Sequence, residues 1–187
     1  MSDGSLWPPD QIDAPPFVLQ RHRAGDAAAM ITAINESLEH LKPWMAWAQE
    51  PATEASIGEF LAGALSSFGE GTEYGYVMRE PSAGEGDAIL GGCGLHRRAG
   101  PGVIEIGYWV HAAHVRRGIA RAASVALRDQ AFALGVERAE IHCDERNTAS
   151  ASVARSAGFA LAGIVPRDPH TPADSEREMI WAAVRPR

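Results

Sequence analysis

The chain has 187 residues, 45% hydrophobic and 22% charged, which suits one globular domain with a sizeable core. Its formal net charge of −7 argues against a protein that binds nucleic acid through phosphate contacts. No apolar run approaches the ~18 residues of a membrane span, and the first residues, MSDGSLWPPD, do not form a secretory signal. Cys93 and Cys143 match no metal or redox spacing, so we expect reduced thiols in a cytoplasmic protein.

The N-terminal part of the chain predicts an arm, a strand and a helix. Residues 1–16 contain four prolines and little periodicity. We therefore expect an N-terminal arm that is poorly ordered or packed against the surface of a main domain, which comprises residues 17–187. Phe17–His22 has the composition of a strand. A helix is expected to begin near Asp26, with apolar residues at steps of three and four, and to end before Pro43.

The following segments change from helical to extended periodicity. After the aromatic segment PWMAW, which contains Trp44 and Trp47, a second helix is expected to begin near Thr53. A period of two then predicts three strands separated by turns, which together form an antiparallel meander: Glu73–Arg79, Ala88–His96 and Val103–Val110.

The second half of the chain alternates helices with single strands. A long helix is expected from about Gly118, with Gly135 just beyond its end. The remaining elements are a strand, a short helix and two final strands: Arg138–Cys143, Thr148–Ala157, Phe159–Val165 and Glu178–Val184. This order predicts one α/β (α+β) domain, with a mixed sheet of about seven strands and about four helices on both faces.

The segment VRRGIA, Val115–Ala120, directly follows a strand and opens the long helix. A helix N-terminus presents unpaired N–H groups and a partial positive charge, and Gly118 leaves room for an anion near the backbone. Arg116 and Arg117 add positive charge, so the turn suits a diphosphate. The alternative is an ordinary strand-to-helix turn, with Gly118 present for its geometry and with solvated arginines.

A second segment, CDERNTASASVARSAGF, contains two polar residues at the start of the short helix. Asn147 is well placed to cap this helix; alternatively its amide binds the amide arm of a cofactor or a substrate carbonyl. Ser150, three residues later, is either a surface serine or a hydroxyl beside the same group.

Two long runs with a fixed order and spacing carry a family resemblance. They are IEIGYWVHAAHVRRGIARAA (Ile104–Ala123) and NTASASVARSAGFALAG (Asn147–Gly163), supported by ESLEHLKPWMAWA and REMIWAAV. In these runs the chain resembles the GNAT superfamily of acetyltransferases, in its RimJ/RimL-type ribosomal-protein N-acetyltransferase branch. The resemblance covers nearly the whole chain after the N-terminal arm.

The resemblance implies a single GNAT-type domain that binds acetyl-CoA. Its mostly antiparallel sheet would open in a V between the strands Val103–Val110 and Arg138–Cys143, with the pantetheine arm in the V. The diphosphate would lie on the amides of Val115–Ala120. The residues implied to bind the cofactor are Tyr108, Trp109, Val110, Val115, Arg116, Arg117, Gly118, Ile119, Ala120, Asn147 and Ser150.

The chain departs from the family pattern at three places. Val115 stands where the phosphate motif usually begins with Gln or Arg, which removes one side chain and leaves the amides. Ala162 stands where RimJ/RimL-type proteins often carry Glu, so a carboxylate proposed as the base in that branch is absent. No tyrosine lies in Thr148–Ala157, where many family members keep one.

The missing carboxylate bears on which amine is acetylated, because the amine must be neutral to attack a thioester. At pH 7 a lysine amine with a pKa of ~10.4 is neutral in about one molecule of 2,500, and an α-amine with a pKa of ~7.8 in about one of 7. The difference is about 3.5 kcal/mol. A site without a dedicated carboxylate therefore fits an α-amine.

Four side chains remain for the proton transfers. Glu105 is the best-placed base, because it lies on the strand that leads to the cofactor; alternatively it is a solvated strand residue. His142 and Asp144, at the end of the facing strand, are candidates for a relay through water, or are surface residues. Ser150 is the expected proton donor to the leaving thiolate.

We therefore expect an enzyme that transfers acetyl directly to a primary amine, on a peptide N-terminus or a small molecule. The acceptor would enter beside the first two helices and the loop between the last two strands, against Trp44, Trp47 and His142, unless the tryptophans belong to the core. No nucleic acid or membrane partner is expected, a homodimer is allowed, and His111 and His114 lack a third metal ligand at a fixed spacing. The alternative function is a GNAT-fold module that senses acyl-CoA without turnover.

Overall fold

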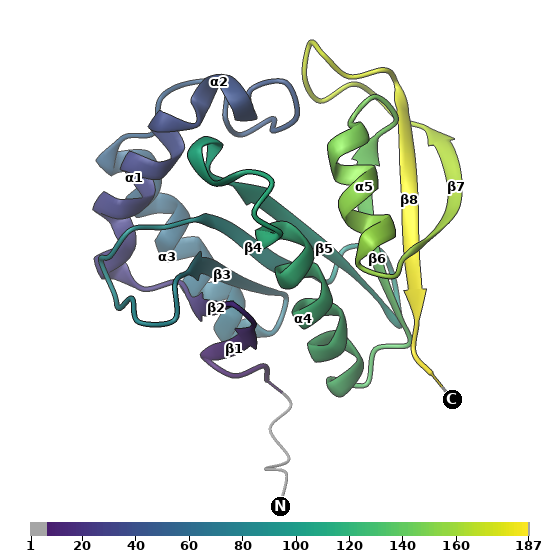
Figure 1. Ribbon diagram of the computed structural model, residues 1–187, viewed down its shortest axis with the longest axis horizontal. Helices are drawn as coiled ribbons and strands as arrows, with labels where there is room; N and C mark the ends of the chain where they lie inside the picture. Colours follow the sequence, from purple (N-terminus) through teal and green to yellow (C-terminus); the bar gives the residue numbers. More distant parts are fainter. Residues whose placement is uncertain (1–6, 187) are drawn as a thin grey trace, which may run out of the picture.

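The computed structural model describes residues 7–186, which form one α/β domain around a single sheet (Figure 1). The eight strands have the order β1-β2-β3-β4-β5-β6-β8-β7, and within these residues only the β5–β6 pair is parallel. The strands are β1 (Gln11–Ala14), β2 (Phe17–Arg21), β3 (Glu73–Arg79), β4 (Gly91–His96), β5 (Val103–Val110), β6 (Arg138–Asp144), β7 (Ala160–Pro166) and β8 (Arg177–Val184). The helices are α1 (Ala27–Glu36), α2 (Leu38–Leu41), α3 (Glu54–Glu70), α4 (Ile119–Ala133) and α5 (Thr148–Ser156), with short 3-10 helices at Ala24–Asp26 and Ala112–His114.

The predicted order of elements is confirmed, and the structure adds one strand. β1 lies within the expected N-terminal arm and pairs with β2 in antiparallel fashion along its whole length. Its alternate residues Ile12 and Ala14 are buried, but two apolar positions are too few to stand out as a strand pattern. The sheet therefore has eight strands where about seven were expected. Residues 1–6 of the expected arm lie outside the described residues.

The first expected helix is interrupted at Ser37. α1 ends at Glu36 and α2 begins at Leu38, and the buried Ser37 between them has a non-helical ψ of 1°. Its hydroxyl accepts a hydrogen bond from the backbone N–H of Ala112, at 3.0 Å. This contact ties the break to the segment after β5. Helical periodicity does not reveal the break, because its partner lies 75 residues away.

Alternation along the central strands sorts side chains onto two faces of the sheet. α4 and α5 cover one face and its larger core, which contains Ile104 and Ile106 of β5. α1 and α3 cover the opposite face, where Trp109 packs against a smaller core (Figure 1). Because successive strand residues alternate, Glu105 and Gly107 share the face of Trp109. We call these the α4/α5 face and the α1/α3 face.

β5 and β6 separate along their length, as Figure 1 shows. Their parallel pairing runs from Val103 opposite Arg138 to Glu105 opposite Glu140 and then stops. Both strands continue beyond that point, to Val110 and Asp144. This confirms the V-shaped opening expected between the two strands.

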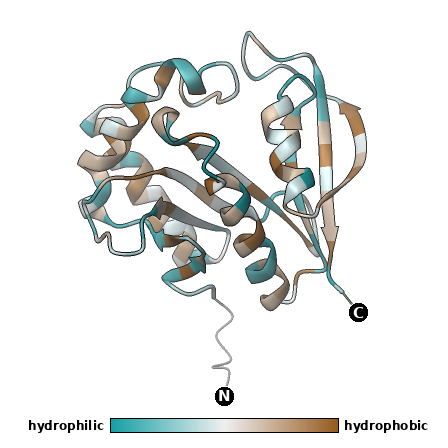
Figure 2. Ribbon diagram, viewed as in Figure 1, coloured by the Kyte–Doolittle hydropathy of each residue, from teal (hydrophilic) through white to brown (hydrophobic). Residues whose placement is uncertain are grey.

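The far edge of the sheet is formed by β7, part of whose ribbon has the hydrophobic colour in Figure 2. Three of its apolar side chains are exposed. They are Leu161, Ile164 and Val165. The pairing of β7 with β8 shifts register at Ala162, between Leu161 and Gly163. No helix within residues 7–186 is long and apolar enough to cross a membrane.

Candidate active site

The turn between β5 and α4 leaves the first amides of α4 without a side-chain cap. Gly118 is the N-cap residue, and its φ of 79° lies in the left-handed region that favours glycine. A Cβ atom built there would meet no described atom within 4 Å, so the space beside the helix end is open. The unpaired amides and the positive end of the helix dipole together form a site for an anion.

The other residues of this turn contribute in different ways. Ile119 and Ala120 bury their side chains, so only their backbone faces the helix end, whereas the side chain of Val115 is exposed. Arg117 donates to Glu80 at 2.8 Å, which offsets part of its charge. Arg116 makes no ion pair within residues 7–186, and its guanidinium is the turn's unpaired cation.

Two hydroxyl groups meet where β5 and β6 separate, on the α4/α5 face. The phenol oxygen of Tyr108 lies 2.8 Å from Oγ of Ser150. Asn147 caps α5, since its Oδ1 accepts a hydrogen bond from the N–H of Ser150 at 3.0 Å. Burial raises the pKa of Tyr108, so the phenol is neutral and able to donate. A tyrosine of β5 thus lies beside α5, which contains none of its own.

Glu105 lies on the opposite face of β5 and is bound by an arginine. Nε and Nη2 of Arg98 donate to its two carboxylate oxygens, each at 2.7 Å. Burial opposes ionisation of the carboxyl, but the hydrogen bonds and the positive charge of Arg98, with a smaller contribution from His142, outweigh it and lower the pKa of Glu105. Glu105 is therefore an ionised carboxylate, and each of its oxygens accepts one hydrogen bond from Arg98.

His142 of β6 is held between two carboxylates. Its Nε2 lies 2.7 Å from Oε2 of Glu140, and its Nδ1 lies 3.4 Å from Oε2 of Glu178. Burial alone would lower the pKa of His142, but hydrogen bonds to Glu178 and Glu140 raise it to about 9. At neutral pH the ring is an imidazolium, which donates from both nitrogens and has no lone pair to accept a proton. Asp144 accepts from the backbone N–H of Ser175 at 2.7 Å and so fixes the loop before β8.

Three glycines lie side by side on the α1/α3 face. Gly75 of β3, Gly94 of β4 and Gly107 of β5 are partners in register. Imidazole rings cover this bare backbone, since a Cβ atom at Gly75 would lie 2.6 Å from the ring of His22. A Cβ atom at Gly107 would lie 3.1 Å from Nε2 of His96. Sequence reasoning missed His96, because only the register between strands places it over Gly107.

Two segments expected to border the site of the acceptor amine, the aromatic segment after α2 and the loop before β8, are joined by a hydrogen bond. Oγ1 of Thr171, in the loop before β8, donates to the carbonyl of Pro43 at 2.8 Å. Trp47 is 52% exposed, and its ring meets that of Trp109 edge to face, with centroids 6.0 Å apart. Trp44 is half-buried. Trp47 and the loop therefore border the α1/α3 face of the opening, where Trp109 of β5 lies.

His111 and His114 border a hollow of about 430 Å³ between α1 and the 3-10 helix before α4. Nε2 of His111 lies 3.0 Å from Oε2 of Glu36, and the two imidazole centroids are 5.1 Å apart. Among residues 7–186 no group of three or more His, Cys, Asp or Glu side chains is placed to hold a metal ion.

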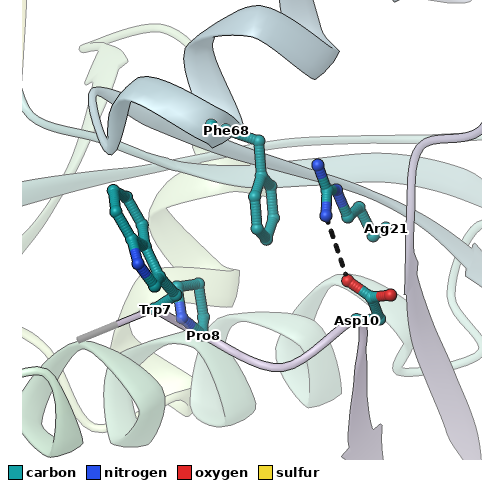
Figure 3. A pocket seen from close by; sticks show the side chains of 6 residues that line it. Trp7, Pro8, Asp10, Arg21 and Phe68 are labelled. Carbon is teal, nitrogen blue, oxygen red and sulfur yellow. Dashed lines mark hydrogen bonds and ion pairs between the residues drawn. The ribbon is translucent and has the colours of Figure 1, made fainter. Parts of the chain in front are cut away.

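A second hollow, of about 330 Å³, lies at the opposite end of the sheet, beside β1 and β2 (Figure 3). Arg21 bridges it: its Nη1 donates to Asp10 at 3.2 Å, and its guanidinium lies 3.8 Å from the ring centroid of Phe68. Trp7 and Pro8 form another wall. These contacts fasten the N-terminal segment to the sheet, five strands away from β6 in the sheet order.

Comparisons with known proteins agree with this geometry. The sequence profile of the family described as Acetyltransferase (GNAT) domain matches residues 17–160. No curated protein sequence matches the chain.

Solved structures with a similar fold include three acetyltransferases crystallised with cofactor. RimL, a ribosomal L7/L12 alpha-N-protein acetyltransferase in complex with coenzyme A, has 19% identity and a TM-score of 0.83, over 94% of this chain and 98% of its own. The microcin C7 self-immunity acetyltransferase MccE, in complex with acetyl-CoA and AMP, has 21% identity and a TM-score of 0.84, over 97% and 99%. RimJ of Mycobacterium smegmatis, in complex with CoA-disulfide, has 24% identity and a TM-score of 0.81, over 96% and 88%.

Proposed function

Because the chain belongs to the GNAT acetyltransferase family, we propose that it transfers acetyl from acetyl-CoA directly to a primary amine. The preferred acceptor is an α-amine, on a peptide N-terminus or a small amino compound. The observation that carries this proposal is the position of the uncapped N-terminus of α4, which follows the strand that separates from β6. A cofactor with an extended amide arm and a diphosphate fits such a site.

The opening between β5 and β6 has unused backbone groups for the pantetheine arm. β5 pairs with β6 only as far as Glu105, so its later N–H and C=O groups on that side have no strand partner within the described residues. Backbone groups in a buried setting need hydrogen-bonding partners, and the amides of pantetheine supply them. We place the arm along Tyr108–Val110 and the diphosphate on Val115–Ala120.

The neutral hydroxyls fit the departure of the thiol. When the amine nitrogen attacks the thioester carbon, the C–N bond forms, the C–S bond breaks and the coenzyme A thiolate takes a proton. Ser150, hydrogen-bonded to Tyr108 at 2.8 Å, is the proposed donor of that proton. The assignment of Glu105 as the base stays a prediction, and the two hydrogen bonds from Arg98 argue against it because they lower the pKa of the carboxyl and so make it a weaker base.

An α-amine acceptor is supported by the residues around the entrance. Ala162 supplies no carboxylate to deprotonate a lysine, and the net charge of −7 mildly favours a cationic acceptor. Trp47, exposed beside Trp109, is placed to contact the residue behind the amine. RimL, which shares the fold, is named for the α-amine of a ribosomal protein. Free thiols at Cys93 and Cys143 suit the cytoplasmic location that we propose.

The experiment that tests the function is release of free thiol from acetyl-CoA, with N-terminal peptides, amino acids and aminoglycosides as acceptors. Thiol release that requires an acceptor, together with a 42-dalton gain by the acceptor (roughly the mass of an acetyl group replacing hydrogen), supports direct transfer. A protein that is stabilised by coenzyme A but releases no thiol with any acceptor would instead be a sensor of acyl-CoA.

A further inference from the structure

His96 of β4 has one ring nitrogen beside a carboxylate and the other without a hydrogen-bond partner in the described residues, as a proton acceptor requires. Its ring lies over the glycine row, with Nε2 3.1 Å from the place of a Cβ atom at Gly107. Its Nδ1 lies 3.1 Å from Oε1 of Glu73, on the neighbouring strand. Nε2 makes no hydrogen bond within residues 7–186, and the side chain is partly exposed, at 23%. One nitrogen therefore faces a carboxylate and the other faces the floor of the α1/α3 face.

The glycine row brings this ring close to the opening between β5 and β6. His96 is the register partner of Glu105, the last residue of β5 that pairs with β6. From there its ring reaches over Gly94 and Gly107, toward the part of β5 that has left β6. A side chain at Gly107 would lie where the ring is, so the glycine permits this placement.

The two carboxylates beside His96 have different states. Glu105 receives both of its hydrogen bonds from Arg98, which lower its pKa, so it stays ionised and stabilises a neighbouring positive charge. Glu73 is half exposed and faces Nδ1. Its Oε1 is 3.1 Å from Nδ1, without the geometry of a hydrogen bond, and its negative charge favours the tautomer that carries the proton on Nδ1 and the lone pair on Nε2. The charged and titratable groups around His96 come from five elements: Glu73 of β3 lies beside its Nδ1, Glu105 of β5 is its register partner, and His22 after β2 lies over the same glycine row. Arg98 after β4 and His142 of β6 interact with Glu105.

We propose that Nε2 of His96, with its ring oriented by Glu73, accepts the proton of the acceptor amine; this rests on the proposed acetyl transfer. The ammonium gives one proton to His96 and becomes the neutral amine, whose lone pair attacks the acetyl carbonyl carbon. The tetrahedral adduct then expels the thiolate of coenzyme A. The second amine proton goes to solvent, and the thiolate takes a proton from Ser150, which regains one from solvent. The ring, held between Glu73 and the ionised Glu105, carries its transient charge beside two carboxylates.

The test compares His96→Gln, Glu73→Gln and Glu105→Gln with the wild-type protein, by kcat/KM for the acceptor across pH. We expect His96→Gln to lower kcat/KM by roughly 10²- to 10⁴-fold and to remove the acidic limb of the profile. Stabilisation by coenzyme A should stay unchanged, which shows that the variant folds and binds cofactor. Glu73→Gln, at a half-exposed position, should cost about ten-fold and displace the limb, as expected for a positioning residue. Added imidazole should restore part of the activity of His96→Ala.

The outcomes separate this inference from the function on which it rests. An active wild-type protein and a His96→Gln variant that keeps its rate and its acidic limb would overturn the assignment of His96 alone. Loss of the limb in Glu105→Gln, with its retention in His96→Gln, would return the base to Glu105. A wild-type protein that releases no thiol with any amine would overturn the proposed function, and this inference with it.

Discussion

The two faces of the sheet differ sharply in chemistry where β5 and β6 separate. On the α4/α5 face, Tyr108, Ser150 and Cys143 are neutral, and burial raises the pKa of both Tyr108 and Cys143. On the α1/α3 face Glu105 and His142 are ionised: the pKa of Glu105 is lowered and that of His142 is raised to about 9. Residues of the same strand are thus neutral on one face and ionised on the other, because successive side chains point to opposite faces of the sheet with different surroundings.

This difference suits a reaction that needs two kinds of group at one carbonyl. A departing thiolate is served by a neutral hydroxyl that donates, and an incoming ammonium is served by bases and counter-charges. An acetyl group lying in the V would have one kind on each side. Three kinds of substitution test this difference between the faces. One prevents binding of the cofactor that would lie between them, one removes a charge from the α1/α3 face, and one removes the hydroxyl groups from the α4/α5 face.

The largest effect is expected from Gly118→Asp, which should prevent the cofactor from binding between the two faces. The new carboxylate would lie beside the uncapped amides of α4, where we propose that the diphosphate binds, and would repel it. Coenzyme A at a thousand-fold excess over Kd should stabilise the wild-type protein by about 4 kcal/mol, and this gain should vanish in the variant. Thermal denaturation with and without coenzyme A measures it.

Gly118→Asn is the matched control. Asn has the shape of Asp without its charge, and it tolerates the left-handed φ of 79° at this position better than most residues. It should keep most of the stabilisation by coenzyme A. If both variants bind coenzyme A as the wild type does, the phosphate site lies elsewhere.

The next effect concerns the ionised face and is read from stability as a function of pH. His142 has a pKa of about 9 in the folded protein, against ~6.5 for an unperturbed imidazole. The raised pKa adds stability on the order of 3 kcal/mol that is fully present below pH ~6.5 and is lost as pH rises through about 9. The free energy of unfolding of His142→Gln should therefore be lower than that of the wild type near pH 6, and the difference should disappear as pH rises to about 10.

Urea denaturation at several pH values measures this, with His40→Gln, at an exposed position of α2, as control. A difference between wild type and His142→Gln that stays constant over the range would mean that the contacts with Glu140 and Glu178 do not hold the ring charged. The control should show no such trend.

The smallest effect is expected from the hydroxyl pair. Tyr108→Phe and Ser150→Ala should each lower kcat by about ten-fold, because a thiolate leaves readily near neutral pH and needs little acid catalysis. If the two hydroxyls act as one donor, the double variant should be little slower than either single variant. Multiplied losses in the double-mutant cycle would show that the 2.8 Å contact between them has no role in turnover.

Sequence patterns predicted most of the fold because most elements have strong local signals. β3 and β5 were predicted with the bounds that the structure shows, since each alternates over seven or more residues. β1 was missed because its four residues carry only two buried positions. The division of α1 from α2 was missed because it depends on the hydrogen bond from Ala112 to Ser37.

The candidate site was predictable only where it is contiguous in sequence. The turn at Gly118 and the cap at Asn147 are local, and both have the helix-end positions expected of them. The pairing of Glu105 with Arg98, and of Tyr108 with Ser150, joins side chains from different elements. His96 over Gly107 likewise depends on the register between β4 and β5, which no single segment specifies.

The most direct test of the central claim is the rate of acetylation of two matched peptides. One has a free N-terminus and no lysine, and the other has a blocked N-terminus and one lysine at the same distance from its end. We predict faster turnover of the free N-terminus, because an α-amine is deprotonated at a cost about 3.5 kcal/mol smaller than that of a lysine. Faster turnover of the blocked lysine peptide would contradict an α-amine acceptor and would require a stronger base than His96 or Glu105 provides.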